Sequence, residues 1–487
     1  MFMFRYYILL SFFSLLLSSH LKAEVTLPKI LGSNMVLQQN KPLPIWGTAS
    51  AGEVVTVSFG VQTICTKADK FGNWEVILNP IAASFKAADM IVSGENTIRL
   101  QNILVGEVWL CSGQSNMAYS MNKSCKYSNA KKSQGLSAEA FHEVDRPDIR
   151  VFLVKRSLYD NDGINRGWEE ADFEALKDFS AAAYFFSKKL KEELDVPIGM
   201  ISSAISGSAI ERWAPKEVFT RKVDFNVQAP KYPEEIDELN DGKFFYSMIQ
   251  PIAPFALKGF LWYQGETNCF KKETFDYTDK MQDLINTWRI NWRDQELPFY
   301  YVQLAPFNYS RNEGETQLNE ETLPEFWEAQ AAALKIPNTG MVVTTDLVDN
   351  PEGIHPSYKW EVGRRLALWA LAKSYGRTKT IYSGPMFTEM KVEGNKIIIG
   401  LSNTGSGLRS SNGEPLNWFS VAGSDGEFVP ANALISGNEI IVSAKAVSSP
   451  VAVHFGWNEA AQPNLINNEG LPAVPFRTDG PMWKSNN

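Results

Sequence analysis

A serine lies in a polar turn directly behind an apolar run in Gly106-Glu-Val-Trp-Leu-Cys-Ser-Gly-Gln-Ser-Asn-Met117. If the run is a parallel strand, Ser115 lies near its carboxyl end, where ligands bind in open α/β sheets. A serine hydroxyl becomes an effective nucleophile when a neighbouring base takes its proton. Glycine, asparagine and serine are also ordinary turn residues, so the segment taken alone favours a simple turn. Ser115 is therefore a candidate nucleophile only together with other motifs.

Two further segments could supply donors to the negative charge that develops when a serine attacks a carbonyl. In Gly259-Phe-Leu-Trp-Tyr-Gln-Gly-Glu-Thr-Asn268 a second apolar run ends in a polar turn, and the amide of Asn268 can donate a hydrogen bond without carrying charge. In Ile205-Ser-Gly-Ser-Ala-Ile-Glu-Arg-Trp213, Gly207 lets a backbone N–H approach a substrate closely. Asn268 is equally typical of a cap or turn, and a loop glycine alone is weak support. With the N–H of Ser115, the two segments predict an oxyanion hole.

A general base must come from a small set of histidines. One of them lies in Asp346-Leu-Val-Asp-Asn-Pro-Glu-Gly-Ile-His-Pro356, between an apolar run and a helical pattern at residues 357–372. An isolated loop histidine is more often structural, but the other three lie in a leader, a polar stretch and a late β-type run. The four histidines of the chain are His20, His142, His355 and His454. Elimination therefore predicts His355 as the base, if the chain uses a histidine.

The elements that must position these residues follow changes of pattern along the 487 residues. Residues 24–104 hold short β-type runs broken by turn residues, which predicts a β-sandwich. Residues 105–377 alternate β-runs with helical patterns, such as the apolar repeat every four positions over residues 180–194, which predicts a parallel sheet with crossover helices. Residues 378–487 are rich in β-type runs again. The length and the 44% hydrophobic content fit about three domains.

Residues 1–23 have the pattern of a secretory signal peptide, with Arg5, an apolar stretch at residues 8–17 and a short polar exit ending at Ala23. A membrane anchor is the competing interpretation, but this stretch is roughly half of the ~20 residues that span a bilayer. We therefore expect an exported protein, periplasmic or extracellular, without membrane insertion. The formal charge is −8, and it becomes −10 once Arg5 and Lys22 leave with the leader. That balance argues against nucleic acid or an anionic membrane surface as the main partner.

Export permits disulfides, so the cysteines need an assignment. Their spacing shows no paired pattern and no zinc motif, and no metal site is expected. Cys111 ends an apolar run and is expected to be a buried thiol, and Cys65 lies apart in the first β-rich region. Cys125 and Cys269 each follow a motif that is expected at the site, which makes them the better pair, although sequence alone does not determine connectivity.

Taken together, Gly113-Gln-Ser-Asn-Met117, Trp262-Tyr-Gln-Gly-Glu-Thr-Asn268 and Ile354-His-Pro356 resemble the bacterial sialate O-acetylesterases, within the SGNH hydrolases. The similarity covers nearly the whole chain behind the leader, including Val36-Leu-Gln and Gly470-Leu-Pro. The resemblance implies a flavodoxin-like catalytic domain between β-sandwich-type accessory regions. It also implies removal of O-acetyl groups from sialic acid through an acetyl-serine intermediate, without a metal or organic cofactor.

The same resemblance assigns Ser115 as nucleophile, Gly207 and Asn268 as oxyanion residues and His355 as base. Two departures from the family pattern stand out. The motif around Gly207 has Ser206 where paired glycines are usual. The aspartate that orients the histidine in the wider superfamily, three residues before it, is replaced here by Glu352.

A triad needs a group that orients the imidazole. Asp349 and Glu352 are the predicted orienters, while Asp346, a backbone carbonyl or a Ser-His dyad stay open. Sialic acid is anionic, so Arg212 is a candidate for binding its carboxylate, and the alternative is an Arg212 paired with a surface acid such as Glu211. Further substrate contacts are expected from the motif side chains Gln114, Gln264 and Glu266.

The leading hypothesis is a secreted serine esterase that deacetylates sialic acids. An acetyl esterase for a plant polysaccharide such as xylan has the same catalytic logic and is the nearer alternative. A non-catalytic carbohydrate-binding protein, built from the two β-rich regions, is the alternative from a different class. The presence of serine, asparagine and histidine motifs together argues against it.

Overall fold

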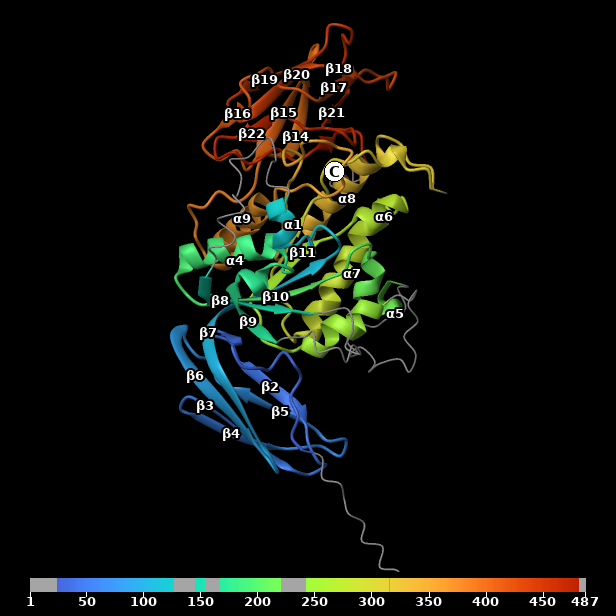
Figure 1. Cartoon of the computed structure of the whole chain (residues 1–487). Coiled ribbons are helices and arrows are strands. Elements are labelled where there is room, and N and C mark those ends of the chain that lie inside the picture. The colour runs from blue at the N-terminus through green and yellow to red at the C-terminus, as the bar shows by residue number, and fades with distance from the viewer. Residues whose placement is uncertain (1–23, 127–144, 155–166, 220–241, 315, 481–487) are drawn as a thin grey trace, which may run out of the picture.

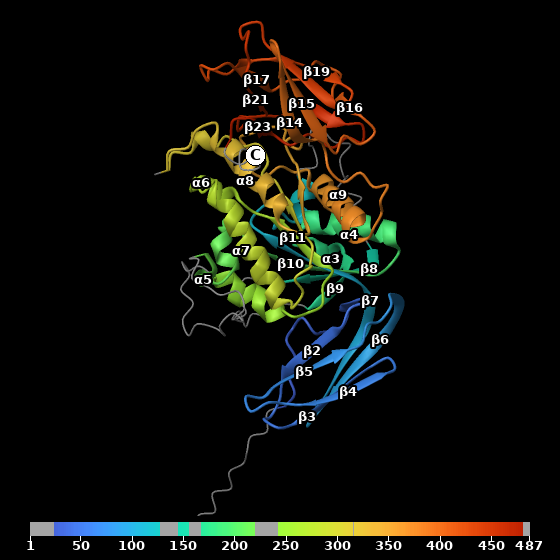
Figure 2. The same cartoon turned by 180° about the vertical axis from the view of Figure 1, so that it is seen from behind.

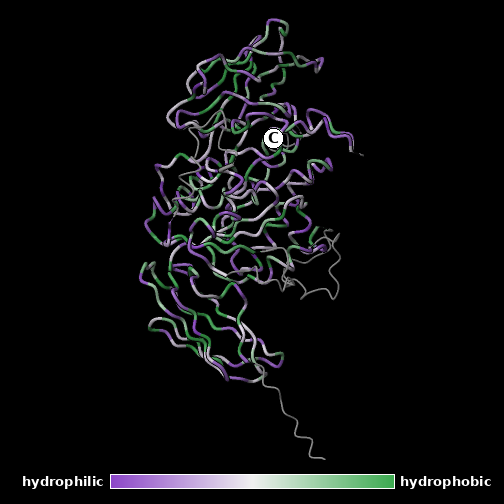
Figure 3. Tube along the Cα trace, in the orientation of Figure 1, coloured by the Kyte–Doolittle hydropathy of each residue, from purple (hydrophilic) through white to green (hydrophobic). Residues whose placement is uncertain are grey.

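The computed structural model describes residues 24–126, 145–154, 167–219, 242–314 and 316–480. The predicted leader at residues 1–23, with His20, and the stretch that contains His142 lie outside the described residues. Three regions follow one another along the long axis of the molecule, with β-structure at both ends and an α/β region between them (Figures 1 and 2). Hydrophobic and hydrophilic stretches alternate along the trace in all three regions (Figure 3).

The first region consists of short strands that lead into one long strand. The strands are β1 (Val36–Gln38), β2 (Leu43–Thr48), β3 (Val54–Phe59), β4 (Gln62–Lys67), β5 (Asn73–Leu78), β6 (Ser84–Ser93) and β7 (Thr97–Gly113). The first half of β7 pairs with β6 and β1, and its second half pairs with β10 (Ile198–Ala204) and β11 (Gly259–Tyr263) of the central sheet. The domain boundary expected at residues 104/105 therefore falls inside a continuous strand.

The central sheet is mostly parallel, as the alternating pattern predicts. Its order is β13-β12-β11-β7-β10-β8-β9, where β8 is Asp145–Leu153, β9 is Trp168–Asp172, β12 is Phe299–Val302 and β13 is Thr339–Val342. Within this path only β9 runs antiparallel to its neighbour. When the edge pair β8 and β9 is set aside, the strands numbered in chain order lie in the order 2-1-3-4-5. The carboxyl ends of the parallel strands thus lie at one edge of the sheet.

Helices cover both faces of this sheet (Figures 1 and 2). On one face α4 (Ala181–Leu194) packs against α9 (Lys359–Trp369), and on the other α7 (Asp276–Asn291) packs against α8 (Thr322–Ala332). The predicted helix at residues 180–194 is confirmed, and Ser180 caps it by accepting a hydrogen bond from the backbone N–H of Ala183 at 3.3 Å. Among the described residues, no helix combines the length and the apolar character that crossing a bilayer requires.

The last region forms two antiparallel four-stranded sheets with a separate core. One sheet has the order β14-β15-β20-β19 and the other β18-β17-β21-β23, with a two-stranded sheet of β16 and β22 beside them. The bounds are β14 Met386–Glu393, β15 Lys396–Ser402, β16 Leu408–Ser410, β17 Phe419–Ala422, β18 Val429–Pro430, β19 Asn432–Ser436, β20 Glu439–Ser443, β21 Ala452–Phe455, β22 Leu465–Asn467 and β23 Phe476–Arg477. His454 lies here, within hydrogen-bond distance of Asp479 at 2.9 Å, so it belongs to this region.

Candidate active site

Ser115 lies in the turn that directly follows β7, at the carboxyl edge of the central sheet. The turn is held by Gln114, whose carbonyl accepts the backbone N–H groups of Met117 and Ala118 at 3.0 and 2.9 Å. Gly113, the last residue of β7, has φ +136°, and a Cβ there would lie 2.1 Å from the carbonyl oxygen of Tyr263. Only glycine lets β7 approach β11 so closely while the chain turns toward Ser115.

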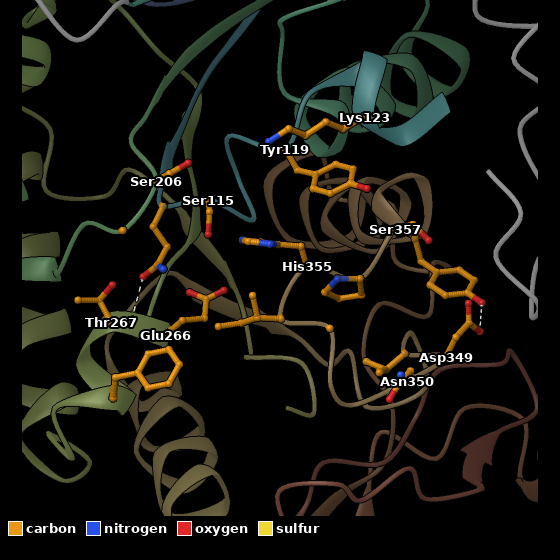
Figure 4. A pocket seen from close by; sticks show the side chains of 18 residues that line it. Ser115, Tyr119, Lys123, Ser206, Glu266, Thr267, Asp349, Asn350, His355 and Ser357 are labelled. Atoms are coloured by element: carbon orange, nitrogen blue, oxygen red, sulfur yellow. Dashed lines mark hydrogen bonds between the residues drawn. The ribbon is translucent and has the colours of Figure 1, made fainter. Parts of the chain in front are cut away.

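Ser115 and His355 line the same pocket, which has a volume of about 700 Å³. The imidazole of His355 points toward the side chain of Ser115, although the two come from loops more than 200 residues apart in sequence (Figure 4). Partial desolvation and the positive charges of Lys359 and Lys123 lower the pKa of His355 below its usual 6.5. A neutral imidazole at pH 7 is the form that accepts a proton.

Two residues at the pocket have backbone N–H groups that are candidates for an oxyanion hole. Gly207 has φ +71° and lines the pocket together with Ser115. Within the described part of the chain, the backbone N–H groups of Ser115 and Gly207 are donors in no hydrogen bond. Both are therefore available to an oxygen that develops negative charge beside Ser115.

Asn268 was expected to donate to the oxyanion, but the structure buries it behind the pocket and does not place it on the pocket wall. Its Nδ2 donates to both carboxylate oxygens of Glu211, at 3.1 and 3.2 Å, and to Glu273 at 2.6 Å. Its Oδ1 accepts from Gln264 at 2.7 Å and from the backbone of Ile210 at 3.1 Å. These partners use both ends of the amide, so Asn268 holds neighbouring loops together in this geometry.

The two glutamines expected to contact substrate differ in position. Gln264 is fully buried, and its Nε2 donates to the side chain of Gln114 at 3.0 Å and to the Ser208 carbonyl at 3.1 Å. Gln114 lines the pocket, and its Oε1 accepts from Gln264 and from the backbone N–H groups of Gly265 and Thr267. The Nε2 of Gln114 has no hydrogen-bond partner among the residues that the structure describes. Gln114 therefore retains a side-chain donor at the pocket, the kind of group that was expected from Asn268.

Glu266 lines the pocket and begins a buried polar network beneath it. Its Oε1 accepts from Asn116 Nδ2, which also donates to the Ile354 carbonyl at 3.0 Å. The Oδ1 of Asn116 accepts from Lys359 Nζ at 2.7 Å, and Lys359 donates to the Pro356 carbonyl at 2.6 Å. The carbonyls on both sides of His355 are thereby tied to the residue that follows Ser115.

Burial changes the protonation of this network. Desolvation raises the pKa of Glu266 and lowers that of Lys359 to about 7. The second carboxylate oxygen of Glu266 is buried without a hydrogen-bond partner in the described part of the chain. Asn116 and Lys359 were not predicted as site residues, although Asn116 belongs to the serine motif and Lys359 lies four residues after His355.

The acidic residues proposed to orient His355 are engaged elsewhere. Asp349 lines the pocket and accepts a hydrogen bond from the hydroxyl of Tyr358. Glu352 is exposed and pairs with Arg311 at 2.7 Å, and Asp346 forms a two-pronged pair with Arg365 at 2.8 and 2.6 Å. Among the described contacts none joins His355 to these carboxylates.

The basic residue at the pocket is Lys123, from α1 (Met121–Lys126), and not Arg212. Arg212 lies in the short helical turn Ile210–Trp213 and is absent from the pocket lining. Glu211, which was named as its possible partner, forms an ion pair with Lys280 at 2.6 Å. Within the described residues, no group of three or more histidine, cysteine or acidic side chains is arranged to hold a metal ion.

The predicted disulfide between Cys125 and Cys269 is not formed, because Cys269 is a free, fully buried thiol. Cys111 is also free and buried, as expected from its place in an apolar run. Burial raises the pKa of Cys269, so the thiol stays protonated and unreactive.

Comparison with known proteins supports the catalytic interpretation. A family model described as a carbohydrate esterase, sialic acid-specific acetylesterase, matches residues 105–372. Human sialate O-acetylesterase is 29% identical over 401 residues, which cover 76% of this chain and 75% of the human protein. The mouse sialate O-acetylesterase is 28% identical over 514 residues, covering 91% and 92% of the two chains.

A solved structure is also similar. The crystal structure of a carbohydrate acetylesterase from Xanthomonas citri has a TM-score of 0.80 and 35% identity, covering 93% of this chain and 99% of that chain. The fold, the serine and histidine in one pocket and these matches define the class of the protein as a carboxylic ester hydrolase. The chain belongs to the sialic acid-specific acetylesterase family of carbohydrate esterases. The predicted resemblance to the sialate O-acetylesterase family is confirmed.

Proposed function

We propose that this chain removes O-acetyl groups from sialic acids by way of an acetyl-serine intermediate. The observation that carries the proposal is the convergence of Ser115 and His355 on one pocket of about 700 Å³, beside the N–H groups of Ser115 and Gly207. A pocket of this size suits one sugar with its acetyl group. The same convergence argues against a purely carbohydrate-binding role, which needs no nucleophile and base.

In the proposed mechanism, His355 takes the proton of the Ser115 hydroxyl as the oxygen attacks the acetyl carbonyl. The N–H groups of Ser115 and Gly207, with Nε2 of Gln114, stabilise the resulting oxyanion. The bond between the acetyl carbon and the sugar oxygen breaks, the sugar oxygen leaves with the proton from His355, and the acetyl group remains bonded to Ser115 Oγ. Water, deprotonated by His355, then attacks the acetyl-serine and releases acetate, which restores the free serine.

The orientation of His355 differs from a standard triad in this proposal. Asp349 and Glu352 stay predicted orienters, but Tyr358 and Arg311 are their described partners. We propose that the Asn116–Lys359 network holds the backbone on both sides of His355, so that the catalytic unit operates as a Ser-His dyad. The hydrogen bonds to the Ile354 and Pro356 carbonyls support this role.

We also propose that the central region is an SGNH hydrolase domain of the flavodoxin-like type, in the bacterial form of the family. The 2-1-3-4-5 order of its main strands supports that assignment. The Xanthomonas citri acetylesterase, which is similar along nearly its whole length, supports the bacterial form. The three domains are proposed as residues 24–104, 105–377 and 378–487.

Substrate choice depends on the charges at the pocket. Lys123 can pair with the carboxylate of a sialic acid, whereas Glu266 and Asp349 line the same pocket and favour an uncharged sugar. Acetylated xylan is therefore the second candidate substrate, and the Xanthomonas citri relative is described only as a carbohydrate acetylesterase.

The test measures acetate release from O-acetylated sialic acid and from acetylated xylan at matched concentrations. We expect faster release from sialic acid, and Ser115→Ala and His355→Ala should each reduce release at least 1000-fold while circular dichroism stays unchanged. Substantial activity in either variant would overturn the mechanism. A preference for acetylated xylan would instead identify the second candidate as the substrate.

Export is a separate proposal that rests on the sequence of residues 1–23. We propose that the signal peptide is removed after Ala23 and that the enzyme acts in the periplasm or outside the cell. Amino-terminal sequencing of the secreted protein is expected to begin at Glu24. A mature protein that still starts at Met1 would contradict it.

A further inference from the structure

A second cleft lies beside the active-site pocket, between the start of α9 and loops of the carboxyl-terminal β-region. Its volume is about 780 Å³. From α9 and the preceding loop it is lined by Asp346, Tyr358, Trp360, Glu361 and Arg365, and from the β-region by Ser411, Asn412, Asn417, Gln462 and Asn464. Tyr358 lines both cavities, so the cleft adjoins the pocket that holds Ser115 and His355 at this side chain.

The α9 side of the cleft offers an aromatic surface and hydrogen-bond acceptors. Trp360 is half-buried, and its ring centroid lies 5.3 Å from that of Tyr358. Asp346 and Glu361 are fixed by the buried Arg365, at 2.6 and 2.7 Å. An aromatic ring beside carboxylates suits a sugar, whose C–H face packs on the ring while its hydroxyls donate to the carboxylate oxygens.

The opposite side offers donors held in place by a buried amide. Asn464 is buried, and its Nδ2 donates to Asn412 Oδ1 at 3.0 Å and to the Pro415 carbonyl at 2.9 Å. The Oδ1 of Asn417 accepts from the backbone of Asn464 at 2.9 Å. Both Asn412 and Asn417 are exposed, and the Nδ2 of each has no partner in the described part of the chain. Their oxygens are thus occupied while their NH₂ groups stay available to hydroxyl oxygens.

The charges of the cleft select against an anion. The guanidinium of Arg365 is engaged by Asp346 and Glu361, and Glu361 also pairs with Arg364 at 2.7 Å. A second acidic sugar placed here would meet two carboxylates whose cationic partners are already bonded. A neutral sugar meets acceptors, donors and an aromatic ring without that repulsion.

We propose that this cleft is a glycan subsite that binds the neutral sugar next to the acetylated one, so that the enzyme acts on oligosaccharides in preference to single sugars. The proposal rests on the proposed deacetylation at Ser115, and it adds the length and charge of the substrate. It also gives the carboxyl-terminal β-region a part in substrate binding.

The experiment compares three substrates: 4-nitrophenyl acetate, an O-acetylated single sugar and an O-acetylated oligosaccharide of the same sugar series. In the first series the single sugar is O-acetylated sialic acid and the oligosaccharide is O-acetylated sialyllactose. In the second series they are O-acetylated xylose and O-acetylated xylotetraose. Asn417→Asp and Asn412→Asp keep the oxygen that the loop uses and replace only the NH₂ group with a negatively charged oxygen. Trp360→Ala removes the aromatic surface, and Asn432→Asp is the matched control on β19, outside the cleft.

For the oligosaccharides, we expect each cleft variant to lower kcat/KM at least 10-fold, mainly through KM. The values for 4-nitrophenyl acetate and for the single sugars should stay within twofold of the unsubstituted enzyme, as should all values for Asn432→Asp. Equal losses on short and long substrates, or no loss on the long ones, would overturn the subsite. Failure of the unsubstituted enzyme to release acetate from any substrate would instead contradict the proposed function.

Discussion

At the scale of single residues, the burial of His355 and the charges around it set the lower end of the pH range in which we expect activity. Partial burial, together with the positive charges of Lys359 and Lys123, holds the pKa of His355 below 6.5. Activity requires the neutral imidazole, so kcat/KM should fall only as the pH drops through that lowered pKa. The midpoint of the acid limb for 4-nitrophenyl acetate is therefore expected below pH 6.5.

Lys123→Gln removes one of these positive charges, which makes protonation of His355 easier. The acid-limb midpoint should move upward by on the order of a few tenths of a pH unit, since an exposed charge acts through solvent. The pH dependence of kcat/KM measures the shift, and low salt should enlarge it. Lys86→Gln, an exposed lysine of β6, should leave the midpoint in place. A downward shift in Lys123→Gln would contradict the assignment.

Asn116 connects the nucleophile turn with the histidine loop. Asn116→Ala removes the donor to the Ile354 carbonyl and leaves Lys359 and Glu266 without their shared partner. We expect kcat to fall about 100-fold with KM nearly unchanged, because a displacement of about 1 Å at the base has that effect. Loss of the buried hydrogen bonds should also lower stability by about 1–3 kcal/mol.

Asn122→Ala, on the exposed face of α1, is the control and should change neither kcat nor stability. Single-turnover acylation with 4-nitrophenyl acetate separates positioning from a purely structural role. If Asn116→Ala loses stability but keeps its acylation rate, Asn116 only supports the fold.

The common pocket of Ser115, Gly207 and His355 could be predicted, because each lies in a turn or loop at the edge of the sheet and sequence patterns mark such places. Asn268 could not be placed, since no pattern shows that Glu211 and Glu273 surround it. Lys359 was not predicted as a site residue for a related reason. A lysine in the first turn of an amphipathic helix normally indicates a solvated face, whereas tertiary packing buries this one completely.

At the scale of elements, the contact between α4 and α9 positions the histidine loop. Gly363 of α9 lies against α4 so closely that a Cβ would be 2.4 Å from the Ala182 carbonyl and 2.7 Å from the Phe186 nitrogen. Both neighbours are helix backbone, which cannot move aside alone. The loop with His355 leads directly into α9, so a shift of this helix displaces the base.

Gly363→Ala should therefore lower the melting temperature by several degrees and reduce kcat for 4-nitrophenyl acetate together with it. Overpacking of this kind typically costs about 1–3 kcal/mol. Thermal denaturation followed by circular dichroism, with kinetics at 25 °C on the folded protein, measures both effects. Gly423→Ala is the matched control, because a Cβ there meets nothing closer than 3.5 Å. An unchanged melting temperature in Gly363→Ala would show that α4 and α9 can separate enough to accommodate the added methyl group without loss of stability.

Strand and helix alternation was predictable from apolar periodicity, and α4 and α9 lie where that pattern indicated them. The continuity of β7 across the two sheets was not predictable. The composition of the chain changes near residue 104, because the strand leaves one sheet and enters another, but its backbone pairing continues without a break. A change in side-chain pattern does not show whether the backbone also ends its strand.

At the scale of the whole molecule, two cores divide the chain differently from the three regions. One hydrophobic core runs from Val25 through the first β-region and the central sheet to Leu371, with Ala461 and Val474 added from the last region. The second core lies within the carboxyl-terminal β-region and includes Val442 and Phe455. We therefore expect the first two regions to unfold together, and the last region to be able to unfold separately.

A pair of matched substitutions tests whether the carboxyl-terminal region unfolds separately from the first two regions. Val57 in β3 and Val442 in β20 are both fully buried, one in each core. Truncation to alanine should destabilise either core by about 2 kcal/mol. Val57→Ala should lower the temperature at which hydrolysis of 4-nitrophenyl acetate is lost, because the strand β7 joins that region to Ser115.

Val442→Ala should lower the calorimetric transition of the carboxyl-terminal region and leave the loss of 4-nitrophenyl acetate hydrolysis at its original temperature. Hydrolysis of acetylated oligosaccharides should nevertheless fail earlier on heating, since Asn412 and Asn417 belong to the part that unfolds first. A single transition that moves equally in both variants would show one cooperative unit. In that case the strand β7 and the contacts at Ala461 and Val474 couple all three regions.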